Sequence, residues 1–261
     1  MPGPTSIADA VGIHSVALPI VFLVVYVALF FVFLWKLRRN PVAVFIFMVA
    51  FCVFRVAAFA VRAAIAASDS LQNDLNWVLT ANIIYTIGFF GLVYSAYSLL
   101  VRRAFVVRDL LRGPFGRLLP RVLIIVRVSL VAAITLGITG ACLFALADPG
   151  SEKKTLGDTL RHVSLWIFLV LVALLLVNCL FVLRHDHSRS MLVLTAIAAL
   201  LFARELYQIL AWNKPEATDE IYFFTLSCLT ELIAVILFLV PNVVPSKNEV
   251  EFSPHRNKDY V

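Results

Sequence analysis

The chain has 261 residues, of which 62% are hydrophobic and 15% are charged, and its mean hydropathy is +0.95. A soluble domain carries roughly 25% charged residues, so this composition excludes a water-soluble globular protein and predicts an integral membrane protein. The formal net charge of +6 comes from basic residues in short loops between apolar segments. This distribution argues against nucleic-acid binding and favours anchoring at the cytosolic face of a membrane.

Apolar segments follow one another along the chain. A membrane-spanning helix needs about 20 mostly apolar residues, and the seven segments that meet this requirement are 15–35, 42–64, 76–100, 122–147, 163–183, 191–212 and 221–241. The predicted fold class is therefore all-α, a polytopic membrane protein with a seven-transmembrane-helix bundle over 15–241. A short tail, 1–14, precedes the bundle, and a polar tail, 242–261, follows it and is expected to be disordered.

The basic residues between the spans predict how the bundle is oriented. With the N-terminus outside, four basic residues lie on the outer side: Lys153, Lys154, Arg161 and Lys214. Fourteen then lie on the cytosolic side: Lys36, Arg38, Arg39, Arg102, Arg103, Arg108, Arg112, Arg117, Arg121, Arg184, Arg189, Lys247, Arg256 and Lys258. Because cytosolic loops carry the excess of Lys and Arg, we expect an outer N-terminus and a cytosolic C-terminus.

Residue types that support catalysis or bind a cofactor lie in the wrong places for either role. The four cysteines all fall inside apolar segments and form neither a disulfide framework nor a metal-binding CxxC pair. Every lysine lies outside the spans, which excludes a retinal Schiff base, and the histidines lie at span edges, in loops or in the tail. No Gly-x-Ser-x-Gly motif or phosphate-binding glycine loop is present. We therefore expect no enzymatic activity, no catalytic residues, no metal and no cofactor.

Four ionisable residues lie well inside the predicted spans: Arg55, Arg204, Glu205 and Glu231. An unpaired arginine at mid-helix costs about 2.5–3.5 kcal/mol on the insertion scale. At 1.5 Å per residue, Arg55 and Glu231 lie about 14–15 Å from the outer ends of their helices, and the other two about 11 Å. Two arginines and two glutamates thus share one layer without net charge, and Arg55 is predicted to pair with Glu231.

Helical spacing adds neutral polar residues to this layer. Asn82 comes to a similar depth on the third span, Tyr85 shares its face, and Gln208 lies four residues after Arg204. The candidate ligand-binding residues are Arg55, Asn82, Tyr85, Arg204, Glu205, Tyr207, Gln208 and Glu231. They predict a polar pocket in the outer half of the bundle, between spans two, three, six and seven. The alternative is an ion-pair lock that only fixes helix packing, and Arg62 is expected to reach the outer interface.

The last two spans carry a family resemblance. The segments LLFARELYQILAW and EIYFFTLSCLTELIAVILFLVPNVVPS resemble the closing part of fungal seven-helix proteins of the lipid-translocating exporter-like family, linked to amphiphile resistance, and its uncharacterised relatives. The matching features are Arg204 and Tyr207, the aromatic residues 222–224, Glu231 and Pro241. The second span is also similar, although this chain has Arg55 where the family has an acidic residue. The resemblance implies membrane residence and a lipid-related or stress-related function.

Several functions remain open on these residues. The first is binding or translocation of a lipid or amphiphile through the polar layer, with membrane lipids and a small amphiphilic ligand as partners. The second is a receptor-like membrane sensor, although the chain lacks the acidic-Arg-Tyr and Asn-Pro-x-x-Tyr motifs of rhodopsin-type receptors. The third is a scaffold whose polar layer only locks helix packing. In each case we expect a multi-pass protein of the plasma membrane or an endomembrane.

Overall fold

The computed structural model describes residues 12–106, 114–147, 151–184, 187–211 and 220–244, and within these ranges the chain is helical without β-strands. Seven helices in the described part of the chain are long and apolar enough to cross a membrane. The predicted all-α, polytopic fold class is therefore confirmed. The tails predicted at 1–14 and 242–261 lie for the most part outside the described residues.

The spans agree with the apolar segments and extend several of them. In chain order the helices are α2 (Ala17–Arg39), α3 (Ala43–Ala67), the short α4 (Asp69–Gln72), α5 (Leu75–Val106), α7 (Pro114–Leu146), α8 (Glu152–Leu183) and α9 (Arg189–Leu210). The last span consists of α10 (Glu220–Tyr222), the π-helix η2 (Phe223–Leu229) and α11 (Thr230–Leu237). Of these, α8 begins well before its apolar segment because Ser151 caps it, with Oγ accepting a hydrogen bond from the Lys154 backbone N–H (3.4 Å).

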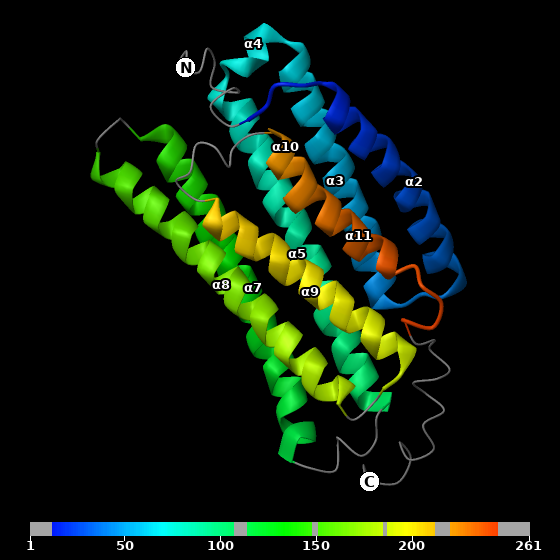
Figure 1. The fold of residues 1–261 in the computed structure, drawn as a ribbon. Helices are drawn as coiled ribbons and strands as arrows, with labels where there is room; N and C mark the ends of the chain where they lie inside the picture. The colour runs from blue at the N-terminus through cyan, green and yellow to red at the C-terminus, as the bar shows by residue number, and fades with distance from the viewer. Residues whose placement is uncertain (1–11, 107–113, 148–150, 185–186, 212–219, 245–261) are drawn as a thin grey trace.

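Successive spans run antiparallel and pack against their sequence neighbours (Figure 1). The helix α5 contacts α3, α7, α8 and α9, and it is the most buried of the spans. By contrast, α7 presents Ile124, Ile125, Val128 and Val131 outward, as a helix that faces lipid must. The described N-terminal and C-terminal residues lie toward opposite ends of the bundle, as an odd number of spans requires (Figure 1).

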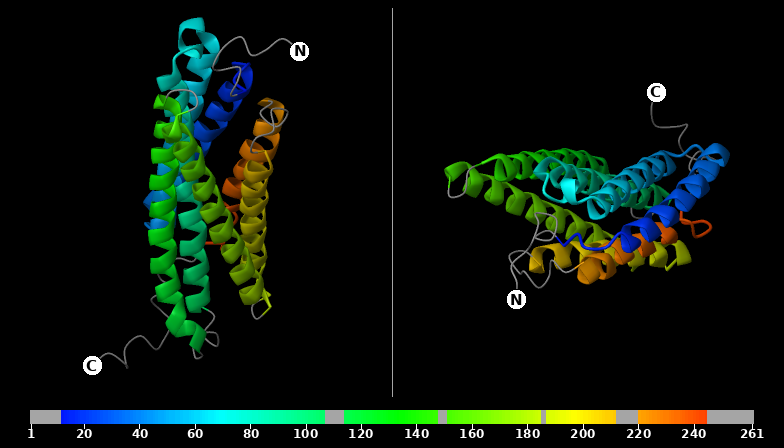
Figure 2. Two further views of the ribbon diagram at one scale, coloured as in Figure 1. Left: turned by 90° about the vertical axis from the view of Figure 1, so that its left-hand side faces the viewer. Right: turned by 90° about the horizontal axis from the view of Figure 1, so that it is seen from above.

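Glycines bring α7 and α8 into close contact. A Cβ atom on Gly140 would lie 2.7 Å from the Gly157 carbonyl oxygen, and one on Gly157 would lie 2.5 Å from the Phe144 backbone nitrogen. Small residues of this kind allow membrane helices to approach at backbone distance. The two helices therefore form one tight hairpin, and Figure 2 shows that α8 diverges from α9 toward the end of the bundle where α2 begins.

Candidate functional site

The deepest polar contact in the bundle is an ion pair between α3 and α11. Both Arg55 and Glu231 are buried, and Arg55 Nε donates a hydrogen bond to Glu231 Oε1 (2.8 Å), as does Nη2. Arg55 Nη1 donates to the Tyr85 backbone carbonyl (2.6 Å), and the guanidinium carbon lies 3.7 Å from the Tyr85 ring centroid. The predicted pairing of Arg55 with Glu231 is confirmed.

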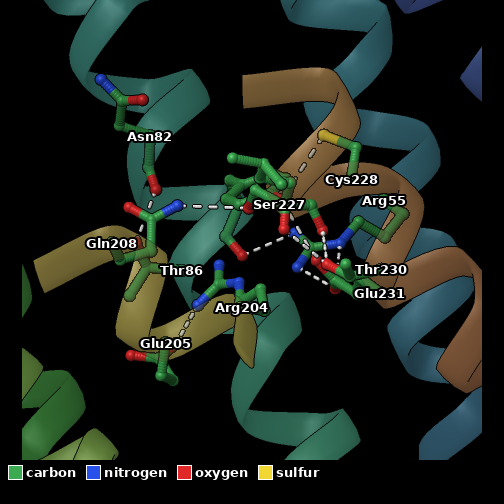
Figure 3. Close-up of polar contacts among 12 residues, drawn as sticks. Arg55, Asn82, Thr86, Arg204, Glu205, Gln208, Ser227, Cys228, Thr230 and Glu231 are labelled. Atoms are coloured by element: carbon green, nitrogen blue, oxygen red, sulfur yellow. Dashed lines mark hydrogen bonds and ion pairs between the residues drawn. The ribbon is translucent and has the colours of Figure 1, made fainter. Parts of the chain in front are cut away.

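A chain of hydrogen bonds leads from this ion pair to α9. Tyr85 Oη donates to Glu231 Oε2 (3.1 Å) and lies 3.1 Å from Ser227 Oγ, which in turn accepts from Gln208 Nε2 (3.2 Å). With Ser227 donating to Tyr85, every hydroxyl and amide in the chain points its proton toward the Glu231 carboxylate. Figure 3 shows the connection from Gln208 through Ser227 to Glu231 and Arg55.

The π-helix η2 supplies Ser227 to this chain. Its wider turn places Ser227 and Cys228 side by side toward Tyr85, whose hydroxyl lies 3.6 Å from Cys228 Sγ. Such π-turns are rare and occur frequently at functional sites. The π-turn therefore connects α9 to the centre of the bundle through Ser227, which lies four residues before Glu231.

The second pair of charges lies on α9 itself. Arg204 Nη1 donates to the carboxylate of its neighbour Glu205, and both side chains are buried. The Arg204 guanidinium stacks on Phe89, 3.9 Å from the ring centroid. Arg204 Nε and Glu205 Oε2 are buried without a hydrogen-bond partner among the described residues. The charged layer expected from depth thus consists of two ion pairs that meet at Tyr85, because the Arg204 guanidinium lies 5.6 Å from the ring centroid against which Arg55 also packs (Figure 3).

A cavity of about 400 Å³ lies beside these pairs, in the half of the bundle toward the start of α2. Its lining residues from α3, α5, η2 and α9 are Arg62, Asn82, Ile83, Tyr85, Thr86, Phe89, Arg204, Glu205, Tyr207, Gln208, Ala211 and Phe223. Six of the eight candidate residues are therefore brought together around one cavity. Arg55 and Glu231 do not line it, because they are fully enclosed in the neighbouring ion pair.

The remaining wall of the cavity comes from α7 and α8, the fourth and fifth spans, which the polar pattern did not include. The lining residues there are Gly137, Ile138, Ala141, Arg161, Ser164, Leu165 and Phe168. Ser164 Oγ donates to the Ala133 carbonyl (2.6 Å) across the hairpin. Apart from Arg161 and Ser164, these side chains are apolar or small, so no charge pattern marks them. The small residues Gly137, Gly140 and Gly157 are the one signal that indicates a close, shaped wall here.

Arg62 takes a different position from the one expected. Instead of reaching the interface it is buried, with 4% of its surface exposed, and it lines the cavity. Its guanidinium lies 4.3 Å from the Phe223 ring centroid and 5.9 Å from that of Phe224, and its Nε has no hydrogen-bond partner among the described residues. The aromatic start of the last span covers it, and this cover explains why it does not extend outward.

The charges around the cavity do not balance. The lining holds three arginines, Arg62, Arg161 and Arg204, and one glutamate, Glu205, and Asp158 next to the lining attracts Arg161. Among the described residues, no group of three His, Cys, Asp or Glu side chains could hold a metal ion. The chemistry that this site offers is recognition of a polar or charged group by arginine, within walls of Phe, Ile and Leu.

The comparisons with known proteins agree with this architecture. The profile of a family described as a domain of unknown function, DUF7702, matches residues 8–247, a range that includes all seven spans. Neither a curated protein nor a solved structure matches the chain. The chain is thus a multi-pass membrane protein that belongs to the DUF7702 family.

Proposed function

We propose that the protein binds a membrane lipid or a related amphiphile in the cavity between α5, α7, α8 and α9. The observation that carries the proposal is the combination of buried, incompletely hydrogen-bonded charges with apolar walls around one cavity of about 400 Å³. Ligand pockets of roughly 300–1,000 Å³ accommodate small molecules. The polar head would contact Arg204 and Glu205, and the protein acts as a binding or translocating protein without catalysis.

The apolar walls suit an acyl or sterol tail. Phe89, Ile138, Leu165 and Phe168 line the cavity from three helices. Toward the start of α2, α8 separates from α9 (Figure 2), and both helices contribute lining residues there. A tail held by these apolar side chains would lie next to the lipid-facing helices α7 and α8. The resemblance of α9 and the last span to the lipid-translocating exporter-like family supports the same ligand class.

The leaflet that supplies the ligand depends on orientation, which we propose from the excess of basic residues on one side. The cavity then opens toward the outer leaflet. Single cysteines at Asp69 and at Arg108, in an otherwise cysteine-free protein, test this with an impermeant thiol reagent added outside intact cells. Modification at position 69 alone is expected, and modification at position 108 alone would reverse the orientation.

A cavity-filling substitution tests the binding site. Ala141 lines the cavity, whereas Ala132, on the same helix, is exposed on the outer surface of the bundle. The probes are dioctanoyl phosphatidylcholine, dioctanoyl phosphatidic acid and dioctanoylglycerol, added to the purified protein in detergent. An amphiphile at about 100 times its dissociation constant stabilises a folded protein by about 2.7 kcal/mol. At least one probe is expected to raise the melting temperature of the parent and of Ala132→Trp, but not that of Ala141→Trp.

Two other results would change the conclusion. If none of the probes stabilises the parent, the amphiphile proposal fails. A receptor-like sensor is the second candidate, and the hydrogen-bond chain from Gln208 in the cavity wall to the Arg55–Glu231 pair favours it. In that case a water-soluble ligand would raise the melting temperature of the protein. Gln208→Leu, which breaks the hydrogen-bond chain to the Arg55–Glu231 pair, would reduce this increase. A scaffold would respond to neither class of ligand.

A further inference from the structure

We propose that the cavity selects amphiphiles with an anionic head group, such as a phosphate monoester, and that Arg62 is the residue that pairs with this head. The inference rests on the proposed function, because it names the ligand class for the same cavity. It comes from a comparison of the buried arginines, since only some of them have a counter-ion within the protein.

Arg62 is a buried cation without a carboxylate partner. Arg55 is paired with Glu231, and Arg204 is paired with Glu205. Within the described part of the chain, Arg62 forms no ion pair, and its guanidinium packs against the rings of Phe223 and Phe224. Arginine remains protonated in proteins, and a buried charge without a partner is strongly unfavourable. A ligand that carries a negative charge would therefore gain more binding free energy at Arg62 than at an arginine that is already paired.

The acidic residue at the start of the last span attracts Arg62 without forming an ion pair with it among the described residues. Glu220 Oε2 accepts a hydrogen bond from the Ser15 backbone N–H (2.9 Å). This contact holds the start of the described chain against the last span. One carboxylate oxygen of Glu220 thus serves a local structural contact, and the Arg62 guanidinium keeps its edge toward the cavity.

The orientation of Arg62 leaves its donors available. An aromatic ring stacked against a guanidinium occupies its face, whereas the N–H groups lie in the guanidinium plane and point outward along its edge. With Phe223 on one face, the edge of Arg62 is held in place, and its Nε has no acceptor in the described structure. An ordered guanidinium edge can bind a phosphate or carboxylate through two parallel hydrogen bonds.

The other two arginines of the lining already have an acidic neighbour. Arg204 is paired with Glu205, and Arg161 is attracted to Asp158 on its own helix. A phosphate monoester carries about 1.5–2 negative charges at pH 7, which would supply the counter-ion for Arg62. A zwitterionic head brings an additional cation next to three arginines and would gain much less.

The test compares two probes that share the same tails. We expect dioctanoyl phosphatidic acid to bind the parent protein at least about tenfold more tightly than dioctanoyl phosphatidylcholine, as one charge-assisted hydrogen-bond pair predicts. In Arg62→Gln this preference should fall to about threefold or less, with phosphatidylcholine binding unchanged. Arg127→Gln, an exposed arginine on α7 outside the cavity, is the matched control and should bind like the parent. Inorganic phosphate alone should bind far more weakly, since it has no tail.

Each outcome separates the two proposals. Equal binding of the two lipids to the parent overturns the anionic selection but leaves amphiphile binding in place, whereas no binding of either lipid overturns both. Preserved selectivity in Arg62→Gln overturns the role of Arg62. Equal effects of inorganic phosphate and phosphatidic acid overturn the amphiphile reading in favour of a soluble anion. If Arg62→Gln does not fold, Arg62→Lys keeps the charge without the planar edge, and it should retain part of the preference.

Discussion

Arg55 and Arg62 lie two turns apart on one face of α3, and both are buried, yet their surroundings differ completely. Arg55 has a carboxylate, a backbone carbonyl and an aromatic ring around it. Arg62 has two aromatic rings and a cavity. Arginine on the same helix face thus forms a buried ion pair at position 55, which we call the lock, and lines a cavity at position 62.

The difference lies in which part of the last span faces each arginine. Opposite Arg55, α11 presents Glu231, the Phe51 and Tyr85 rings pack against the guanidinium, and the Arg55 side chain has no exposed surface. Opposite Arg62, η2 presents Phe223, and the cavity lined by α5, α7, α8 and α9 lies beside the guanidinium. A buried arginine is therefore informative about function only when its partners are known. The counter-ion, and not burial itself, separates the two roles.

Breaking the lock should have the largest effect. Glu231→Gln keeps the shape of the side chain but leaves the Arg55 charge buried and unpaired, which we expect to destabilise the protein by about 3–5 kcal/mol. The measurement is thermal and denaturant unfolding in detergent. Glu152→Gln, an exposed acidic residue at the start of α8, is the control and should change stability by less than about 0.5 kcal/mol.

The double substitution Arg55→Met with Glu231→Leu sharpens this result. It removes both charges, so it should recover most of the stability lost in Glu231→Gln. An unfolding midpoint of Glu231→Gln equal to that of the parent would mean that the Arg55 charge is hydrated and that no dry lock exists.

An intermediate effect is expected from the wall of the cavity. In Gly157→Ala, the new Cβ meets the backbone of α7 at 2.5–2.8 Å, so α7 and α8 must separate. We expect a loss of about 1–3 kcal/mol and a weaker response to amphiphiles. Gly91→Ala is the control, because its Cβ would be 3.6 Å from the nearest atom and the better helix propensity of alanine should stabilise α5 by up to about 1 kcal/mol. Equal behaviour of the two variants would show that the hairpin is not packed at backbone distance.

The smallest effect should come from Arg62 in the unliganded protein. Arg62→Gln removes a buried charge that forms no ion pair among the described residues and also loses the aromatic contacts of Arg62, so these two contributions largely offset each other. We expect the free energy of unfolding to change by less than about 1 kcal/mol, measured as for Glu231→Gln. A loss as large as that of Glu231→Gln would place Arg62 in the lock and remove the contrast between the two arginines.

The sequence by itself determined the fold class and the central ion pair. Each of the seven apolar segments is long enough to cross a bilayer as a helix. A helix pairs the backbone N–H and C=O groups of a segment within that segment, as the absence of water in the bilayer core requires. The pair of Arg55 and Glu231 followed from depth along known helix rise, since unpaired charges at that depth are too costly to leave apart. The length, hydropathy and charge of a segment are local properties, so a single sequence is enough to predict features that depend on them.

Only the tertiary structure decided which residues surround the cavity. Three features depend on how each helix is rotated and tilted against its neighbours. They are the pairing of Arg204 with Glu205, the burial of Arg62 under Phe223, and the cavity wall formed by α7 and α8. Rotation is set by packing, and here by the glycine contacts between α7 and α8 and by the π-turn at the start of the last span. In lipid both faces of a span are apolar, so the hydrophobic pattern that marks the buried face of a soluble helix is largely absent. The inward face of each span therefore becomes visible only once the helices are packed.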